Sequence, residues 1–144
     1  MGIGQVSLVL LDTHAWVWLL NGSERLGSKA RKAIQQSVAE EAVLVSAISP
    51  WEVAMLVAKG RLVLDRDVSE WVQTALSLPG IRLEPISPEV AVASTRLPGT
   101  IHADPADRLI AATARHLGST LITADQLLFD YSKDGHLRTL RAGQ

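Results

Sequence analysis

Four acidic residues that lie far apart in the chain stand at positions where carboxylates could act together: Asp12, Glu52, Asp107 and Asp125. Asp12 and Asp125 each follow a short apolar run that is typical of a strand. Glu52 and Asp107 lie in the first turns of predicted helices. In a parallel sheet the strands end, and the helices after them begin, at the same edge, which is where ligands bind. The four carboxylates can therefore converge on one cleft.

Carboxylates gathered in this way would repel one another. Two unit charges about 4 Å apart cost roughly 4 kcal/mol at an effective dielectric constant near 20. A helix cap contributes only about 1 kcal/mol, so capping would not explain a convergent cluster. Such a cluster needs a cation, and ligands that offer only oxygen favour Mg²⁺ or Mn²⁺ over zinc.

Each acid also has a plain structural role when it is considered alone. Asp12 and Asp125 can cap the helices that follow them. Glu52 can close a capping box with Ser49, and Asp107 can complement a helix dipole. For any single acid the structural role is favoured, and only the joint pattern favours a metal site.

Asp104 is the ambiguous member of the acidic set. It precedes Pro105, which suits the first position of a helix, so Asp104 fits the N-cap. It also lies three residues before Asp107, which makes it a candidate accessory acid. Both interpretations stay open at this point.

Apolar periodicity predicts strands that alternate with helices. The expected strands are Val6–Leu11, Ala42–Ser46, Ile81–Ile86, Thr120–Thr123 and, at an edge, Leu137–Leu140. The expected helices are Thr13–Leu20, Ser28–Glu41, Ser49–Lys59, Val68–Leu78, Ser87–Leu97, Pro105–His116 and a short one that ends near Tyr131. This order predicts a single α/β domain over residues 1–144, a three-layer α/β/α sandwich with a mostly parallel central sheet.

Composition narrows the chemistry further. The 144 residues include no cysteine, which excludes disulfides, thiolate metal sites and cysteine nucleophiles and suits a reducing cytoplasm. Apolar runs are too short to cross a membrane, so we expect a cytoplasmic protein without membrane attachment. The net charge of −1 argues against wide phosphate neutralisation, although an enzyme can still meet nucleic acid locally through metal ions. No nucleophile elbow or phosphate-binding glycine loop is present.

Four sequence blocks, in order, carry a family resemblance. They are Leu10–Ala15, Ser49–Ala54, His102–Ala112 and Leu121–Asp125. Together they resemble PIN-domain ribonucleases, and within these the VapC-type toxins of bacterial toxin–antitoxin pairs. The resemblance extends from about Val6 to Tyr131.

The resemblance implies a Mg²⁺- or Mn²⁺-dependent endoribonuclease that hydrolyses RNA phosphodiester bonds. Carried over residue by residue, Asp12, Glu52, Asp107 and Asp125 would form the catalytic acidic quartet. Asp12 and Asp107 would be the main metal ligands, with Glu52 and Asp125 completing the shell directly or through water. The resemblance also implies a homodimer and a cognate antitoxin protein that inhibits the enzyme.

Several neighbours of the quartet have less distinctive roles. Thr13 and Thr123 are expected to form hydrogen bonds, and Arg108 is expected to hold the structure beside Asp107. A loop-stabilising role is favoured for His102. Trp51 is the best outside candidate for a contact with an RNA base.

Two apolar helices suggest a partner surface. Thr13–Leu20 is apolar nearly all round, and with Ser49–Lys59 it is predicted to line an antitoxin groove, where charge at Trp16 and Leu56 should disrupt binding. The other tryptophans are expected in the core or an interface. An alternative function follows from the same surface, a PIN-like module that binds protein or RNA with little catalysis.

Overall fold

The structure, a computed structural model, describes residues 8–144. The strands are β1 (Val9–Leu11), β2 (Val43–Ser46), β3 (Ile81–Glu84), β4 (Thr120–Thr123) and β5 (Arg138–Arg141). The helices are α1 (Thr13–Leu20), α2 (Ser28–Val38), α3 (Ile48–Ala58), α4 (Val68–Leu76), α5 (Pro88–Ala93), α6 (Pro105–Leu117) and α7 (Gln126–Ser132). The predicted order of elements is confirmed. The first two residues of the predicted first strand, Val6 and Ser7, lie outside the described residues.

The strands form one sheet in the order β3-β2-β1-β4-β5. Every neighbouring pair is parallel, so the sheet is wholly rather than mostly parallel. Central β1 pairs Leu10 with Leu44 of β2 and with Leu121 of β4. Because all the strands run the same way, their carboxyl ends meet at one edge, as the quartet requires.

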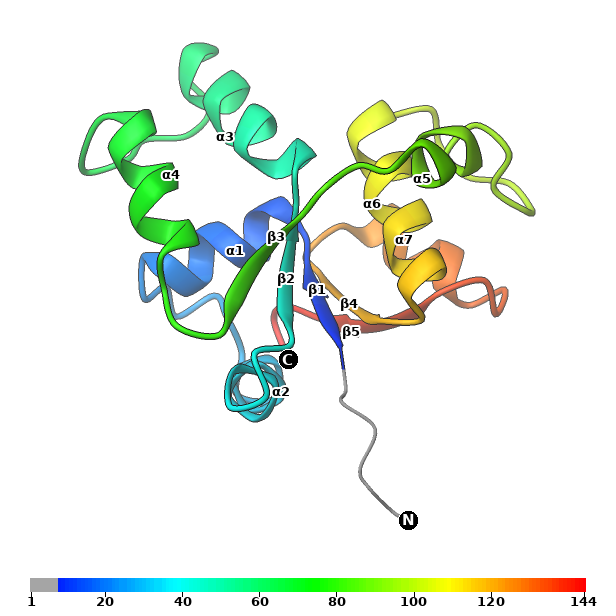
Figure 1. Cartoon of the computed structure of the whole chain (residues 1–144), viewed down its shortest axis with the longest axis horizontal. Helices are drawn as coiled ribbons and strands as arrows, with labels where there is room; N and C mark the ends of the chain where they lie inside the picture. Colours follow the sequence, from blue (N-terminus) through cyan, green and yellow to red (C-terminus); the bar gives the residue numbers. More distant parts are fainter. Residues whose placement is uncertain (1–7) are drawn as a thin grey trace.

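Helices cover both faces of the sheet (Figure 1). Alternate strand residues point to opposite faces, so Leu11 and Val45 pack on the side of α1, α2 and α4. Leu10, Leu44 and Leu121 pack on the opposite side against α6 and α7. Two buried apolar clusters, one on each face, therefore make the predicted three-layer sandwich, and α3 stands above the carboxyl edge of the strands (Figure 1).

Trp16 lies in the core and not in a groove. Its side chain is 0% exposed, and its ring packs edge-on against Trp71 with 4.9 Å between centroids. The prediction that Trp16 meets a partner is therefore wrong. Consecutive apolar residues of α1 face the sheet and α4 as well as the surface, and sequence alone does not distinguish these directions.

The start of α3 also differs from the prediction. The helix begins at Ile48 after Ala47, and Ser46 Oγ accepts a hydrogen bond from the Ile48 amide at 3.2 Å. Ser49 is therefore already inside the helix, and its buried hydroxyl lies 3.0 Å from Thr13 Oγ1. The predicted Ser49–Glu52 capping box does not form, because both side chains are engaged by α1 instead.

Helix α6 begins at Pro105 as predicted and ends at Leu117, one residue later than predicted. Asp104 caps it by accepting the Asp107 amide at 3.0 Å, and Pro105 takes its first position. Gly118 ends it with φ of 63°, a conformation that favours glycine. Among the described helices, none has the length and apolar character needed to cross a membrane.

Candidate metal centre

Four elements carry the predicted acids to the carboxyl edge of the sheet. Asp12 follows β1 and Asp125 follows the neighbouring β4. Glu52 lies on α3 and Asp107 in the first turn of α6, two helices that contact each other. The parallel topology thus brings together residues separated by up to 113 positions in the sequence.

Asp12 is held firmly beneath this edge. One carboxylate oxygen accepts the Thr123 hydroxyl at 2.6 Å and the Ala124 amide at 2.8 Å, and the other accepts the Ala15 amide at 2.8 Å. Burial raises the pKa of Asp12, while these hydrogen bonds oppose the rise. Asp12 therefore caps α1, as predicted, and ties β1 to the end of β4.

Asp107 stands at the centre of the acidic site. Its half-buried carboxylate lies 2.7 Å from His102 Nε2, within hydrogen-bonding distance. Burial raises the pKa of Asp107 to about 7; nearby Asp125 and Asp104 add to this rise, and the His102 contact opposes it. A carboxylate in these surroundings is readily stabilised by a cation.

Two groups of potential ligands share Asp107. One contains His102, Asp107 and Asp125, and the other contains Glu52, Asp104 and Asp107, with ligand atoms within 4.8 Å of one another in each group. The structure therefore brings two of the other three quartet acids, Glu52 and Asp125, close to Asp107. Asp12 belongs to neither group, although its charge contributes to raising the pKa of Glu52.

Glu52 is oriented by hydroxyl groups. Thr13 Oγ1 donates a short hydrogen bond to Glu52 Oε1, and Ser49 Oγ is the other partner of the Thr13 hydroxyl. Burial raises the pKa of Glu52, the Thr13 hydrogen bond lowers it, and the charge of Asp104 raises it. The predicted hydrogen-bonding role of Thr13 is thus confirmed, and its partner is a site acid.

Asp125 combines two tasks. Its Oδ1 accepts the amides of Leu127 at 2.8 Å and Leu128 at 3.1 Å, so it caps α7. The Thr123 hydroxyl, which donates to Asp12, accepts the Asp125 amide at 3.0 Å. Asp104 likewise caps α6 and lies among the candidate ligands, so its two interpretations are compatible.

Arg108 fixes the loop that carries His102. Its guanidinium donates to the carbonyl oxygens of Ser94 at 3.0 Å and of Ile101 and His102 at 3.4 Å each. This confirms the structural role predicted for Arg108. His102 is thereby held against Asp107.

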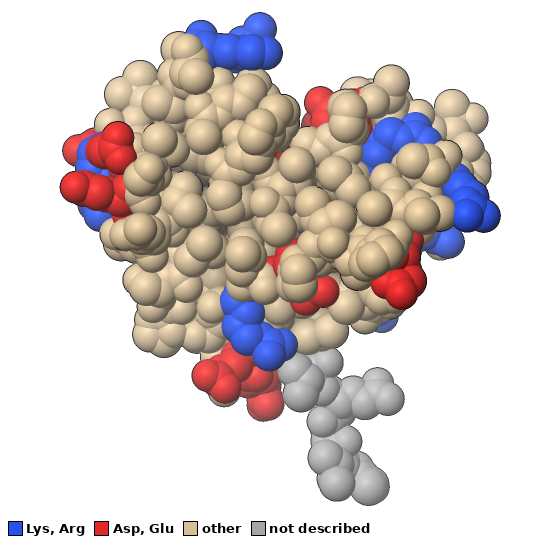
Figure 2. Space-filling model, turned by 45° about the horizontal axis from the view of Figure 1, so that its top comes forward, with Lys and Arg blue, Asp and Glu red and all other residues tan. Residues whose placement is uncertain are grey.

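In the described part of the chain, the acids of the site are not paired with lysine or arginine. Among residues 8–144, no lysine or arginine forms an ion pair with the quartet or with Asp104. Figure 2 shows acidic atoms near the notch of the outline and in the middle of this face, as well as acidic and basic atoms around the rim. The oxygen-rich donor set and the unneutralised charge fit Mg²⁺ or Mn²⁺.

Comparisons with known proteins identify the fold that carries this geometry. Residues 9–133 match the family model described as the PIN domain. The chain belongs to the PIN domain family. This PIN domain is 37% identical over 123 residues to Ribonuclease VapC22 of Mycobacterium tuberculosis, a match that covers 85% of this chain and 91% of the relative.

Solved structures share the PIN fold at lower identity. VapBC2 from Rickettsia felis bound to a promoter DNA fragment has a TM-score of 0.68 at 17% identity, covering 93% of this chain and 98% of the other. FitAcB from Neisseria gonorrhoeae has a TM-score of 0.63 at 23% identity, covering 94% and 98%. A toxin–antitoxin complex from Klebsiella pneumoniae gives 0.60 at 21%, covering 93% and 97%.

The residue of this PIN domain site that sequence reasoning undervalued is His102. The sequence favoured loop stabilisation, whereas the structure places the imidazole on Asp107 and among the candidate ligands. The available signal was its position inside the His102–Arg108 block. The path of the loop before Pro105 brings His102 back to Asp107, and the sequence does not show this path.

Proposed function

We propose that this PIN domain protein is a metal-dependent endoribonuclease, the toxin of a toxin–antitoxin pair, which acts on RNA in the cytoplasm and is neutralised by a cognate antitoxin. The observation that carries the proposal is the convergence of two candidate ligand groups on Asp107. Support also comes from the similarity to Ribonuclease VapC22 and from fold neighbours solved as toxin–antitoxin complexes.

In this proposal Mg²⁺ or Mn²⁺ is held by Asp107, with Asp125 and Glu52 completing its shell and Asp104 as an accessory acid. When bound, the ion activates a water and stabilises the charge that builds on the phosphoryl oxygens. Asp12 is proposed as the fourth member of the quartet, a ligand directly or through water.

The surrounding residues keep these carboxylates in place. Thr13 orients Glu52, and the Thr123 hydroxyl with the Ala124 amide orients Asp12. His102 positions Asp107, since a hydrogen bond to a ligating carboxylate fixes its direction and tunes its basicity. Substitution of such supporting residues commonly costs about 10- to 100-fold in metal affinity or activity.

The test is the isosteric substitution Asp107→Asn. It should abolish cleavage of RNA by the purified protein and growth arrest on expression, and EDTA should abolish cleavage by the unchanged protein. Asp65→Asn is the matched control, because Asp65 is exposed and pairs with Arg66 away from the site. Undiminished cleavage by Asp107→Asn, or cleavage that persists in EDTA, would refute the proposal.

A binding module is the second candidate function. It is favoured by α3, a largely apolar helix in which only Ser49 and Val53 are buried. Trp51 on this helix is 57% exposed beside Glu52, where it can contact an RNA base or a protein. Tight RNA binding without metal-dependent cleavage would favour this function over the enzyme. Both functions allow a homodimer.

A further inference from the structure

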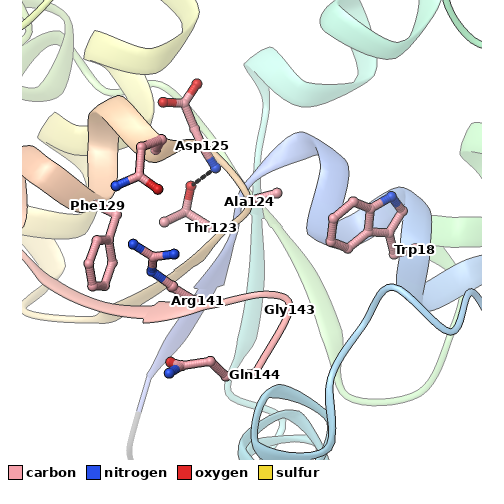
Figure 3. A pocket seen from close by; sticks show the side chains of 9 residues that line it. Trp18, Thr123, Ala124, Asp125, Phe129, Arg141, Gly143 and Gln144 are labelled. Atoms are coloured by element: carbon pink, nitrogen blue, oxygen red, sulfur yellow. Dashed lines mark hydrogen bonds between the residues drawn. The ribbon is translucent and has the colours of Figure 1, made fainter.

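A pocket of about 430 Å³ opens beside the acidic site at the same edge of the sheet. Figure 3 shows Arg141 and Phe129 on one side of it, Asp125 and Thr123 above, and Trp18 across from Phe129. Asp125 belongs both to this pocket and to the ligand group around Asp107. Asp125 therefore places the pocket next to the proposed metal centre.

Arg141 supplies the pocket with an oriented positive charge. It ends β5, in register with Thr123 of β4, so its position on the edge is fixed by the sheet. Its guanidinium carbon lies 4.0 Å from the centroid of the Phe129 ring. Stacking on an aromatic ring presents the planar fork of N–H donors toward the pocket.

The donors of Arg141 are free for a ligand. Within residues 8–144, its side chain forms no hydrogen bond or close ion pair. Asp130 attracts it only through space and is itself bound by Gln126 Nε2 at 2.8 Å and Lys133 Nζ at 3.4 Å. Asp125 faces the same pocket, and its Oδ1 is occupied by the amides that it caps. An unpaired guanidinium of this kind suits a phosphate, which it can bind through two hydrogen bonds.

Trp18 gives the opposite wall an aromatic surface. Its side chain is partly buried, and the Arg25 guanidinium lies 6.0 Å from its ring. Aromatic side chains beside cations are the pairing that proteins use to bind single-stranded nucleic acid, with the base stacked and the phosphate neutralised. The volume of the pocket is within the range of about 300 to 1,000 Å³ that is usual for small-molecule sites.

We propose that this pocket binds one nucleotide of single-stranded RNA adjacent to the scissile phosphate, with Arg141 holding its phosphate and Trp18 stacking on its base. The proposal rests on the proposed function for its direction, since Asp125 links the pocket to the metal centre. Arg141 is then a binding residue that sets where the RNA lies and not a metal ligand.

The test compares Arg141→Ala, Arg141→Lys and Arg82→Ala in an Asp107→Asn background, which blocks cleavage. Arg82 is the matched control, an exposed arginine on β3 at the opposite edge of the sheet. The probe is a fluorescently labelled single-stranded RNA of about ten nucleotides, within the usual site size. Fluorescence anisotropy gives the dissociation constant at several salt concentrations, and thermal melting checks that each variant folds.

Arg141→Ala should weaken RNA binding roughly tenfold, as expected for the loss of one charge-assisted hydrogen-bonded contact. The slope of log affinity against log salt should fall by about 0.7, the effect of one phosphate contact on a single strand. Arg141→Lys should keep the slope and lose part of the affinity, because it retains charge but not the planar fork. Arg82→Ala should change the affinity less than twofold.

A second measurement locates the phosphate. A set of RNA probes carries one neutral methylphosphonate linkage each, at a different position in each probe. The protein that retains Arg141 should bind one of these probes more weakly than the others. This difference should vanish in Arg141→Ala. Equal effects of Arg141→Ala and Arg82→Ala, or no linkage dependent on Arg141, would overturn the proposal. So would normal RNA binding by Arg141→Ala with loss of antitoxin binding alone.

The outcome is separable from that of the proposed function. Without the Asp107→Asn change, Arg141→Ala should raise KM for cleavage while kcat stays within about twofold, the pattern of a lost uniform binding contact. If Arg141→Ala cleaves RNA in a metal-dependent way with an unchanged KM, the proposed RNA-binding role of the pocket is refuted and the proposed nuclease function is not. RNA binding that depends on Arg141 in a protein that never cleaves RNA would overturn the nuclease and leave the pocket standing.

Discussion

Asp107 is a residue of the site whose charged form is disfavoured by burial and by neighbouring carboxylates. Its neighbours include Asp104 and Asp125, and its hydrogen-bond partner is His102. In a protein without a bound cation these surroundings disfavour the charged carboxylate. The same arrangement that prepares a metal site therefore lowers the stability of the metal-free fold at neutral pH.

The raised pKa of Asp107 makes the stability of the metal-free protein fall as pH rises. The pKa of Asp107 in the folded protein, about 7, lies above the ordinary value of 3.8 for an aspartate. The folded state thus binds this proton more tightly, and stability in EDTA should fall as pH rises from about 4 to 7. Asp107→Asn should accordingly raise the free energy of unfolding at pH 8 by roughly 1 to 3 kcal/mol. The gain should shrink toward pH 5, as measured by urea unfolding.

The control for this prediction is Asp65→Asn. Asp65 is exposed and its pKa is lowered, first by its hydrogen bond with Arg66, so its neutralisation should bring no stabilisation at pH 8. A metal-free Asp107→Asn protein that is no more stable than the unchanged protein at pH 8 would contradict this account of the acidic site.

Among the secondary-structure elements, helix α3 contacts α1 through its polar side chains and presents an apolar surface on its other side. Glu52 and Ser49 engage Thr13 of α1, while much of the remaining surface is apolar and incompletely covered. An apolar helix surface left in this state is normally covered by a partner. The antitoxin groove therefore stays a prediction for α3, whereas Trp16 of α1 is buried and cannot line it.

Leu56 is the position on α3 at which to test partner binding, because it is half-buried and outside the acidic site. Leu56→Glu should weaken binding of the cognate antitoxin by at least tenfold, since a charge would be desolvated at the interface. Isothermal titration calorimetry measures this affinity. RNA cleavage by the free protein should stay within about twofold of normal, because the substitution spares the contacts that orient the site acids.

Val92→Glu provides the comparison, since Val92 is a similarly apolar residue that is 48% exposed on α5. Antitoxin binding that survives Leu56→Glu, or that is lost equally in Val92→Glu, would count against α3 as the partner surface.

At the scale of the whole molecule, a bound metal is expected to link elements that pack on the two sides of the sheet. The candidate ligands come from α3, α6 and the segment after β4, which belong to separate parts of the packing. A cation that binds the folded arrangement alone must stabilise it by mass action.

Saturating Mn²⁺ or Mg²⁺ should therefore raise the melting temperature. At a concentration 100 times the dissociation constant the stabilisation is about 2.7 kcal/mol, which corresponds to roughly 5 to 10 °C for a chain of this size. Differential scanning fluorimetry measures the shift. It should disappear in Asp107→Asn, and NaCl at equal ionic strength should not reproduce it. An equal shift in Asp107→Asn would place the ion elsewhere.

The sequence by itself determined the order of the elements and some of their ends. Thr120–Thr123 is a strand with its predicted bounds, Asp104 and Pro105 start α6, and Gly118 ends it. These features depend on near neighbours in the chain, through side-chain caps, fixed backbone angles and apolar periodicity. Parallel strands then oblige Asp12 and Asp125 to share an edge.

Only the tertiary structure decided which side chains meet at that edge. Thr123 reaches Asp12 across 111 residues, and Ser49 turns from a predicted cap into a partner of Thr13 across 36. Trp16 is buried, His102 folds back onto Asp107, and Arg141 stacks on Phe129. Such contacts depend on how separate elements pack and on how loops approach them, and no local pattern records either. The sequence therefore shows which chemical groups the site can contain, whereas the packing of the elements determines which side chains contact one another.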